Sequence, residues 1–321
     1  MTTALETQIR SQPEALGRMV AVDITEAAKS VATWQRLWLI GTGTSEHAAM
    51  IGARMFQDAG VDAHAIPAMH FACWPPQLRP GDAAVVITHT AETAYALAAR
   101  ERALAAGMSV LPITRIGGGL PDSIETVEKE TSETYTVSYT TTLLLLARLA
   151  GSLGSSVFTD EAIARVPDAA RAALADSGVG GIEQPQRLLV LTGAGIAAAS
   201  AREGALKLRE AARFPAEAYD AEFLLHGNAV PLTGADHLVI LTPPQDDNGF
   251  LSGVARVADA AGLPVTRVAE PADLPPPLAQ IPLTVRLQLL ALRFSEERGQ
   301  DPDTVITGAW DDATLWGLGS P

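Results

Sequence analysis

The sequence repeats one order of features twice: a short apolar run, a turn that contains glycine and then an alanine-rich helical run. The first copy covers residues 36–59 and the second covers residues 187–213. A strand followed by a glycine turn and a helix is the start of a βαβ unit, and the continuous apolar run at residues 83–88 is typical of a buried parallel strand. Further helices are expected at residues 6–30 and 286–297. The sequence therefore predicts an α/β protein with an internal duplication.

The composition limits the partners of the chain. Its 321 residues are 47% hydrophobic, which is enough for two cores. The formal net charge of −14 argues against a nucleic-acid partner and against an anionic membrane surface. An anionic substrate would have to be held by local groups, because the field of the whole protein repels it.

The chain shows no targeting or membrane signal. Residues 1–19 alternate in charge and lack the apolar core of a signal peptide. The longest apolar stretch, residues 143–150, contains Arg148 and is far shorter than the ~20 residues that span a bilayer. The single cysteine, Cys73, excludes an internal disulfide. We therefore expect a soluble, cytoplasmic protein.

Residues 200–213 are predicted to form a helix that carries a row of charges. Ala, Leu, Lys, Arg and Glu dominate this segment, and all are strong helix formers. At about 100° per residue, Glu203, Lys207 and Glu210 fall on one edge of the helix. One interpretation is an exposed Glu–Lys pair that stabilises the helix weakly. The other is a proton-transfer site, because His226 follows in a glycine-containing segment.

Three short motifs in this region resemble one protein family. EGALKLRE at residues 203–210, AEAY at 216–219 and LLHG at 224–227 are similar to the second sugar isomerase (SIS) domain in the isomerase half of glucosamine-6-phosphate synthase and to related sugar-phosphate deaminases and deglycases. The resemblance implies two SIS domains, each a doubly wound, mainly parallel sheet flanked by helices. We expect these domains at residues 1–157 and 158–321.

The resemblance also implies roles for individual residues. Glu210 would move a proton between C1 and C2 of an open-chain sugar, with Glu203 and Lys207 beside it in the pocket. His226 would assist ring opening and would reach into the site of a neighbouring subunit. The resemblance thus implies a homodimer and an anionic sugar substrate, without a cofactor.

The first of two loops predicted to bind the anionic group of the substrate follows residues 36–40. Gly41 and Gly43 lack the third glycine of a dinucleotide fingerprint, so the loop suits a phosphate-like group better than NAD. The helix that follows can offer backbone N–H groups to an anion. The family motif CGTS falls on Thr42, Gly43, Thr44 and Ser45. The resemblance implies that Thr44 and Ser45 bind the anion and that Thr42 and Gly43 line the sugar pocket.

The second loop, THTAET, runs from Thr88 to Thr93 and resembles the family's phosphate loop SQSGET. Thr88, Thr90 and Thr93 take the hydroxyl positions, while His89 replaces glutamine and Ala91 replaces glycine. Each hydroxyl can donate to an anionic oxygen. The anion is expected to be a phosphate or a sulfonate. A sulfonate carries only one charge and would therefore suit a loop with little positive charge. N-capping of the next helix is the alternative interpretation of these threonines.

The segment ETSETYTVSYTTT, which starts at Glu130, resembles the family segment that surrounds the sugar. Thr134, Tyr135 and Thr136 take the pocket positions, and Val137 stands where the family often has lysine. The C-terminal tail contains no lysine, so it offers no Schiff base. The tail either folds over the pocket as an apolar lid or packs on the surface.

Isomerisation of a hexose with an anionic group at C6 is the function we expect. It would proceed through a cis-enediol, with proton transfer by a carboxylate whose pKa lies near the working pH. An amino-sugar-phosphate deaminase or a fructosamine-phosphate deglycase begins with the same steps and is one alternative; a non-catalytic sugar-phosphate sensor is another. Glutamine-dependent synthesis is not expected, because the chain starts at the SIS region. The six scattered histidines predict no metal site.

Overall fold

The computed structural model describes residues 2–79, 81–244 and 248–317. The chain divides into two compact units, each assembled from discontinuous segments. The first unit contains Glu14–Thr131, Val137–Arg165 and Ile306–Pro321; the second contains Met1–Pro13, Ser132–Thr136 and Val166–Val305. Helix α1 (Ala4–Ala21) contributes to both units.

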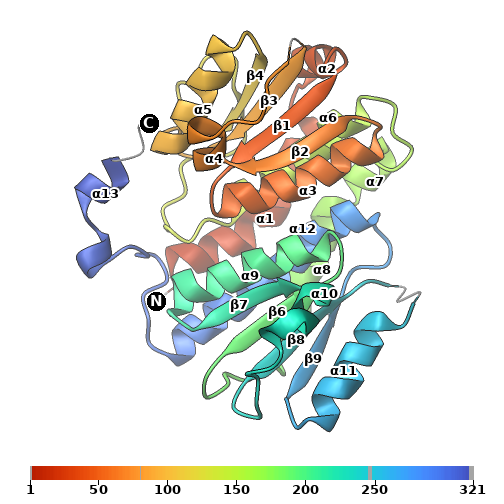
Figure 1. Ribbon diagram of the computed structural model, residues 1–321, viewed down its shortest axis with the longest axis vertical. Coiled ribbons are helices and arrows are strands. Elements are labelled where there is room, and N and C mark those ends of the chain that lie inside the picture. The colour runs from red at the N-terminus through yellow and green to blue at the C-terminus, as the bar shows by residue number, and fades with distance from the viewer. Residues whose placement is uncertain (1, 80, 245–247, 318–321) are drawn as a thin grey trace. The chain divides into compact units, whose positions relative to one another are not determined.

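The first unit is built on a parallel sheet with the strand order β2-β1-β3-β4-β5 (Figure 1). Its strands are β1 (Arg36–Gly41), β2 (Asp62–Pro67), β3 (Asp82–Ile87), β4 (Ser109–Thr114) and β5 (Ile124–Glu125). The chain runs from β1 outward to β2, and then from β3 outward to β4. The order therefore reverses between β1 and β3, and loops that follow these two strands lie where open α/β sheets bind ligands.

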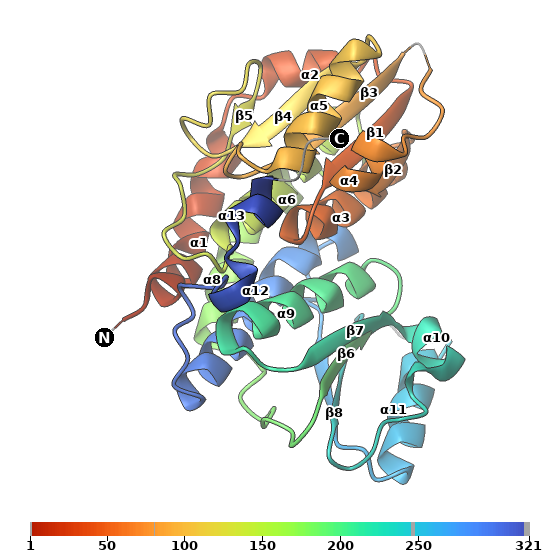
Figure 2. The same cartoon turned by 60° about the vertical axis from the view of Figure 1, so that its left-hand side comes forward.

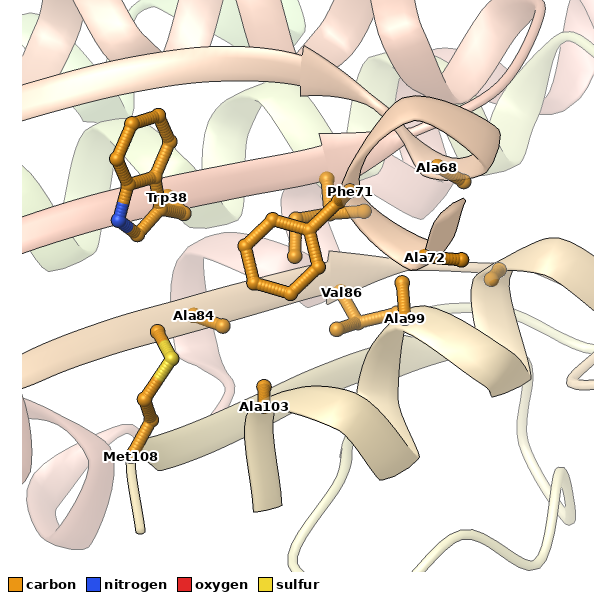
Figure 3. Close-up of a cluster of buried hydrophobic side chains, with 11 residues drawn as sticks. Trp38, Ala68, Phe71, Ala72, Ala84, Val86, Ala99, Ala103 and Met108 are labelled. Carbon is orange, nitrogen blue, oxygen red and sulfur yellow. The ribbon is translucent and has the colours of Figure 1, made fainter. Parts of the chain in front are cut away.

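Helices cover both faces of this sheet. One face carries α4 (Ala68–Cys73) and α5 (Ala94–Ala105), whose alanines let the helices lie close to β1 and β3. Figure 3 shows the resulting core, in which the Phe71 ring of α4 lies near Val86 of β3. The unit also contains α2 (Thr25–Val31), α3 (Thr44–Asp58), α6 (Val137–Gly151), α7 (Asp160–Ala164), η2 (Gly308–Trp310) and α13 (Ala313–Gly317).

The second unit has a parallel sheet with the strand order β7-β6-β8-β9 (Figure 2). Its strands are β6 (Leu189–Gly193), β7 (Ala216–Asp220), β8 (His237–Thr242) and β9 (Val265–Ala269). Its helices are α8 (Val166–Ala175), α9 (Ala197–Ala212), α10 (Ala221–Phe223), the π-helical turn η1 (Leu224–Asn228), α11 (Phe250–Ala260) and α12 (Pro276–Glu297). None of the helices in the described parts of the two units is long and apolar enough to cross a bilayer.

Two glycines show the internal duplication at atomic detail. A Cβ on Gly52 of α3 would lie 2.8 Å from Leu39 of β1 and 2.7 Å from Leu146 of α6. A Cβ on Gly204 of α9 would lie 3.0 Å and 2.8 Å from the corresponding leucines of β6 and α12. In both units, the helix after the first strand therefore needs a glycine where it packs between that strand and a second helix. The α/β class with two doubly wound sheets is confirmed.

Two helix predictions are corrected. The helix expected at residues 6–30 is interrupted, because the Asp23 carboxylate accepts hydrogen bonds from Thr25 N at 2.9 Å and from Thr25 Oγ1 at 2.6 Å, which starts α2 as a separate helix. The helix expected at residues 286–297 begins ten residues earlier, at Pro276. It continues through Pro282, because burial of its apolar residues outweighs the cost of an internal proline.

Candidate active site

The two predicted anion loops follow neighbouring strands of the first unit. Residues 42 and 43 connect β1 to α3, whose first two residues complete this loop motif, and residues 88–93 connect β3 to α5. Because β1 and β3 pair directly and in parallel, both loops lie at the carboxyl edge of the sheet, at the point where the strand order reverses. Gly43 precedes α3 with a φ of 55°, a conformation that favours glycine. Thr44 and Ser45 open α3, where backbone N–H groups point toward the loop.

The threonine hydroxyls of the second loop are not used as helix caps. Thr93 occupies the N-cap position of α5, but its side chain makes no capping hydrogen bond. Thr90 Oγ1 accepts one hydrogen bond, from Glu92 N at 3.2 Å, and keeps its proton for another acceptor. Thr88 is 2% exposed, and its hydroxyl has no hydrogen-bond partner among the residues that the structure describes. Buried hydroxyls are rarely left without a partner, so the N-capping interpretation does not account for this loop.

Ala91 holds the turn of this loop in a conformation that suits glycine. Its φ is 60°, in the left-handed region where a Cβ is unfavourable. The SIS motif that this loop resembles has glycine here, the residue that adopts this conformation without strain. The loop keeps its shape at a local cost in conformational energy.

His89 is a half-buried residue of this loop, and its burial favours the neutral form of the ring. Its Nε2 lies 3.2 Å from Glu130 N and accepts that hydrogen bond, so the ring proton of the neutral form lies on Nδ1. Burial lowers the pKa of His89, and the Glu130 carboxylate opposes this effect. Glu130 in turn accepts hydrogen bonds from Val137 N at 3.1 Å and Ser138 N at 2.8 Å and so caps α6. Glu130 is not among the site residues predicted from the sequence, although a glutamate ahead of a helical run is a signal for such a contact.

Positive charge near the loop comes from outside it. Arg115 N donates to His89 O at 2.8 Å, and the Arg115 guanidinium donates to Ile116 O and Gly117 O at 3.0 Å each. After burial and the opposing effect of Glu130, the charges of Arg115 and Lys129 lower the pKa of His89 further. The loop itself contains no lysine or arginine, but its surroundings are more positive than the sequence alone indicated.

The charged row predicted on residues 200–213 lies inside the second unit. Glu203 and Lys207 are each 0% exposed, so the interpretation as an exposed pair is wrong. Lys207 Nζ lies 3.4 Å from Glu203 Oε1 and 2.6 Å from Glu210 Oε2. Helix α9 packs against β6, β7 and α12. One ammonium is therefore shared by two carboxylates in a low-dielectric environment.

Glu210 has the electrostatic setting of a proton-transfer group. Its side chain is 19% exposed, so its carboxylate does not face open solvent. Burial raises the pKa of Glu210 above its ordinary value, while the charge and hydrogen bond of Lys207 act against this rise. A carboxyl group with a raised pKa can both accept and return a proton near neutral pH.

His226 lies on the surface of the second unit. It is in η1, its side chain is 70% exposed, and its Nε2 lies 3.9 Å from Glu222 Oε1. Leu225 and Val230 beside it are 52% and 84% exposed. A groove of about 480 Å³ lies between η1 and α11, and its lining is largely apolar. The structure thus presents His226 outward, next to exposed apolar surface.

Three of the predicted sugar-pocket residues, Thr134, Tyr135 and Thr136, belong to the second unit, whereas Thr42 and Gly43 belong to the first. Thr134 is 1% exposed, and its hydroxyl donates to Pro302 O at 2.8 Å. Thr136 is buried and Tyr135 is half-buried. In the tail, Trp310 and Trp316 are 74% and 60% exposed. Within the described ranges, no three His, Cys, Asp or Glu side chains are grouped so that they could hold a metal ion.

Comparisons with known proteins relate the whole chain to one group. No family model matches it. It is 26% identical over 330 residues to a glutamine–fructose-6-phosphate aminotransferase (isomerizing) of Pyrobaculum aerophilum, and the match covers 92% of this chain and 55% of the relative. A second such aminotransferase, from Pyrococcus horikoshii, is 28% identical over 335 residues, with the same coverage of 92% and 55%. The chain thus spans about half the length of the curated relatives that it matches.

Solved structures share the fold over nearly the full chain. The tagatose-6-phosphate ketose/aldose isomerase of Escherichia coli matches with a TM-score of 0.79 and 20% identity, covering 97% of each chain. The glucosamine-6-phosphate deaminase of Thermotoga maritima matches with a TM-score of 0.79 and 20% identity, covering 94% of this chain and 97% of the other. The two parallel sheets of this chain agree with these likenesses, which concern the fold. The chain is therefore similar to glutamine–fructose-6-phosphate aminotransferases (isomerizing) over about half of their length, and it shares its fold with a solved ketose/aldose isomerase and a solved deaminase.

Proposed function

We propose that the chain is an aldose–ketose isomerase that acts on a hexose with an anionic group at C6. The observation that carries this proposal is the buried arrangement of Glu210 and Lys207, in which Nζ lies 2.6 Å from Oε2 and burial raises the pKa of the carboxyl group. Such a group is suited to take a weakly acidic proton and to return it to a neighbouring atom. Two likenesses support the same class of reaction. One relative is named an isomerizing aminotransferase, and a solved ketose/aldose isomerase has the same fold.

The proposed reaction moves one proton between adjacent carbons. His226 assists opening of the sugar ring. The Glu210 carboxylate then removes the proton from C2 of the aldose, and the electron pair of that C–H bond forms the double bond of a cis-enediol as the carbonyl oxygen takes up a proton. The protonated Glu210 returns its proton to C1 while the C2 hydroxyl loses one, which gives the ketose. The Lys207 ammonium stabilises Glu210 in its ionised form before the first proton transfer and after the second.

The anionic group at C6 is assigned to the loop at residues 88–93 together with Thr44 and Ser45. Two observations support this assignment. The Thr88 hydroxyl has no hydrogen-bond partner among the described residues and the Thr93 side chain does not cap α5, and the N-termini of α3 and α5 lie at the loops. Phosphate is the group named by the relatives, and sulfonate is the alternative. A sulfonate carries one charge, so it loses less solvation energy than a phosphate on entering a loop of neutral donors. Competition between a 6-phospho and a 6-sulfo hexose at equal concentration distinguishes the two.

We further propose a homodimer in which His226 acts in the site of the other subunit. The His226 side chain is 70% exposed, which leaves it accessible to a second subunit. The exposed Leu225 and Val230 and the apolar groove between η1 and α11 offer surface that a second copy would cover. The division of the chain into one SIS domain at residues 1–157 and a second at residues 158–321 also stays a prediction.

A deaminase or deglycase is the second candidate, since the chain shares its fold with a glucosamine-6-phosphate deaminase. These reactions use the same ring opening and proton transfer but release ammonia or an amino acid. A coupled ammonia assay with a 6-phosphorylated amino sugar separates them from isomerisation. A sensor would bind the sugar and raise the melting temperature without exchanging any proton.

The deciding experiment follows solvent deuterium by NMR. The protein is incubated in D₂O with a panel of hexose 6-phosphates, 6-sulfohexoses and fructosamine 6-phosphates, and deuterium is measured at the carbon next to the carbonyl. We expect exchange with at least one sugar and its loss in Glu210→Gln. Glu26→Gln, which changes an exposed carboxylate paired with Lys29, is the control and should keep full exchange. Full exchange in Glu210→Gln would remove Glu210 from the proposed role.

A further inference from the structure

A polar cavity of about 380 Å³ lies in the first unit, away from the loops at the carboxyl edge of the sheet. It is formed where α6 ends, where α7 begins and by the residue that precedes α2. Its size is that of a site for a small ligand. The residues that carry the argument are Arg148, Ser152, Ser155, Thr159 and Asp160, with Phe158 as apolar lining.

Arg148 brings a positive charge into this cavity without a carboxylate partner. Its Nη1 donates to Met19 O at 2.8 Å and to Val22 O at 2.7 Å, which satisfies carbonyls at the end of α1. In the part of the chain that the structure describes, Nε and Nη2 have no hydrogen-bond partner and Arg148 forms no ion pair. Burial lowers the pKa of Arg148, and the charges of Asp160 and Asp23 oppose this. A partly buried guanidinium with free donors favours an anionic partner.

Asp160 lines the same cavity with the opposite charge. It is the first residue of α7, but the cap of that helix is Thr159, whose Oγ1 accepts from Ala162 N at 3.2 Å. No described residue forms a hydrogen bond or an ion pair with the Asp160 side chain. Asp160 and Arg148 influence each other electrostatically yet do not form an ion pair. The cavity therefore presents one negative and one positive group that are not paired with each other.

Hydroxyl groups add directional hydrogen bonds between these charges. Ser155 Oγ accepts from Val157 N at 3.2 Å and Thr159 Oγ1 from Ala162 N, so the proton of each hydroxyl remains available to an acceptor. Ser152 Oγ donates to Leu149 O at 2.7 Å, so its lone pairs remain available to a donor. The lining can thus serve a ligand with acceptor oxygens and donor nitrogens together.

We propose that this cavity is a binding site for a small zwitterion of the α-amino acid class. The ligand carboxylate pairs with the free edge of the Arg148 guanidinium and accepts from the Ser155 and Thr159 hydroxyls. The ligand ammonium pairs with Asp160 and donates to Ser152 Oγ. Phe158 offers an apolar contact for a small side chain. The site is separate from the proposed isomerase residues and does not depend on that function.

The test compares three probes of similar size by isothermal titration calorimetry. L-Alanine carries both charges, propionate lacks the ammonium and ethylamine lacks the carboxylate. We expect saturable binding of L-alanine and at least tenfold weaker binding of propionate and ethylamine. Asp160→Asn should weaken L-alanine at least tenfold, while Glu161→Gln, a change at the next residue of α7 outside the cavity, should leave its affinity unchanged.

A second variant guards against a misfolded protein. Ser155→Ala keeps both charges and should weaken L-alanine severalfold while the melting temperature stays that of the parent. The proposal is overturned if L-alanine does not bind saturably, if propionate or ethylamine binds as tightly, or if Asp160→Asn keeps the full affinity. Proton exchange with hexose substrates should be unaffected by Asp160→Asn, so failure of this site is distinguishable from failure of the isomerase proposal.

Discussion

Lys207 Nζ lies 2.6 Å from Glu210 Oε2, on a helix edge where Lys207 is 0% exposed. The same ammonium lies 3.4 Å from Glu203, so it serves two carboxylates at once. With one cation for two anions, the group as a whole favours holding a proton, and burial raises the pKa of Glu210. The Lys207 ammonium compensates the buried carboxylates and so stabilises the fold. The same charges also set the proton affinity of Glu210, the proposed base.

Replacing Lys207 with methionine should separate these two aspects. Both carboxylates would then be buried without a cation, and the free energy of unfolding should fall by about 3–5 kcal/mol at neutral pH. Because Lys207 lowers the pKa of Glu210, its loss should move the acidic limb of the kcat/KM profile to higher pH. Lys29→Met, at an exposed lysine paired with Glu26, is the control and should change neither quantity. A pH profile identical to that of the control would contradict the role of Lys207.

Subunit mixing tests the placement of His226. Glu210→Gln and His226→Ala homodimers should each be inactive. If His226 serves the site of the other subunit, a mixed dimer contains one intact site and one site with both changes. Refolding the two variants together at equal concentration should therefore restore about a quarter of the parent activity in a symmetric dimer. No recovery despite dimers seen by light scattering would place both residues in the same subunit's site.

Glu270 predicts a pH dependence of stability. It is 6% exposed, Gln280 Nε2 donates to it at 3.0 Å, and burial raises its pKa. A carboxyl group with a raised folded-state pKa contributes stability that is fully present below its unfolded pKa and is lost as the pH rises through the folded value. Glu270→Gln keeps an acceptor for Gln280 and removes the titration. Urea unfolding at pH 5 and pH 8 should show a smaller drop for the variant, and an equal drop would contradict this assignment.

Ala91 should be more stable as glycine. The substitution removes a Cβ from a residue with a φ of 60°, which costs about 1–2 kcal/mol for a residue other than glycine. We expect Ala91→Gly to raise the melting temperature and to keep anion binding. Ala98→Gly, inside α5, is the matched control and should lower stability by about 1 kcal/mol. A loss of stability in Ala91→Gly comparable to that control would show that the Cβ makes a favourable contact.

The paired glycines of the two units should respond alike. Gly52→Ala and Gly204→Ala would each push a Cβ against leucines at 3.0 Å or less, and each should cost about 1–3 kcal/mol. Gly17→Ala in α1 meets nothing within 4 Å and should instead stabilise the protein by about 0.5–1 kcal/mol. Differential scanning calorimetry of the three variants checks both signs. Unequal effects at Gly52 and Gly204 would mean that the two copies of the packing differ in tightness.

Local patterns predicted the regular elements of the sheets well. Strands β1 and β3 lie within one residue of the apolar runs at residues 36–40 and 83–88, and the helix predicted at residues 200–213 is α9 with its start moved to Ala197. Elements with weak local signals were harder to see. Strand β7 has five residues at the edge of its sheet, and the first half of α12 contains Pro282. Both exist because neighbouring elements bury them, which a window of sequence does not contain.

The sequence by itself determined the α/β class, the duplicated strand–turn–helix order and the residues that resemble SIS motifs, because these depend on periodicity and on neighbours along the chain. The tertiary structure decided that Glu203 and Lys207 are buried, that the threonines of the loop after β3 are not caps, and that Arg115 and Glu130 surround His89. The physical reason is that burial, partners and local charge are set by residues distant in sequence, and these quantities give a carboxyl group or a hydroxyl its chemistry.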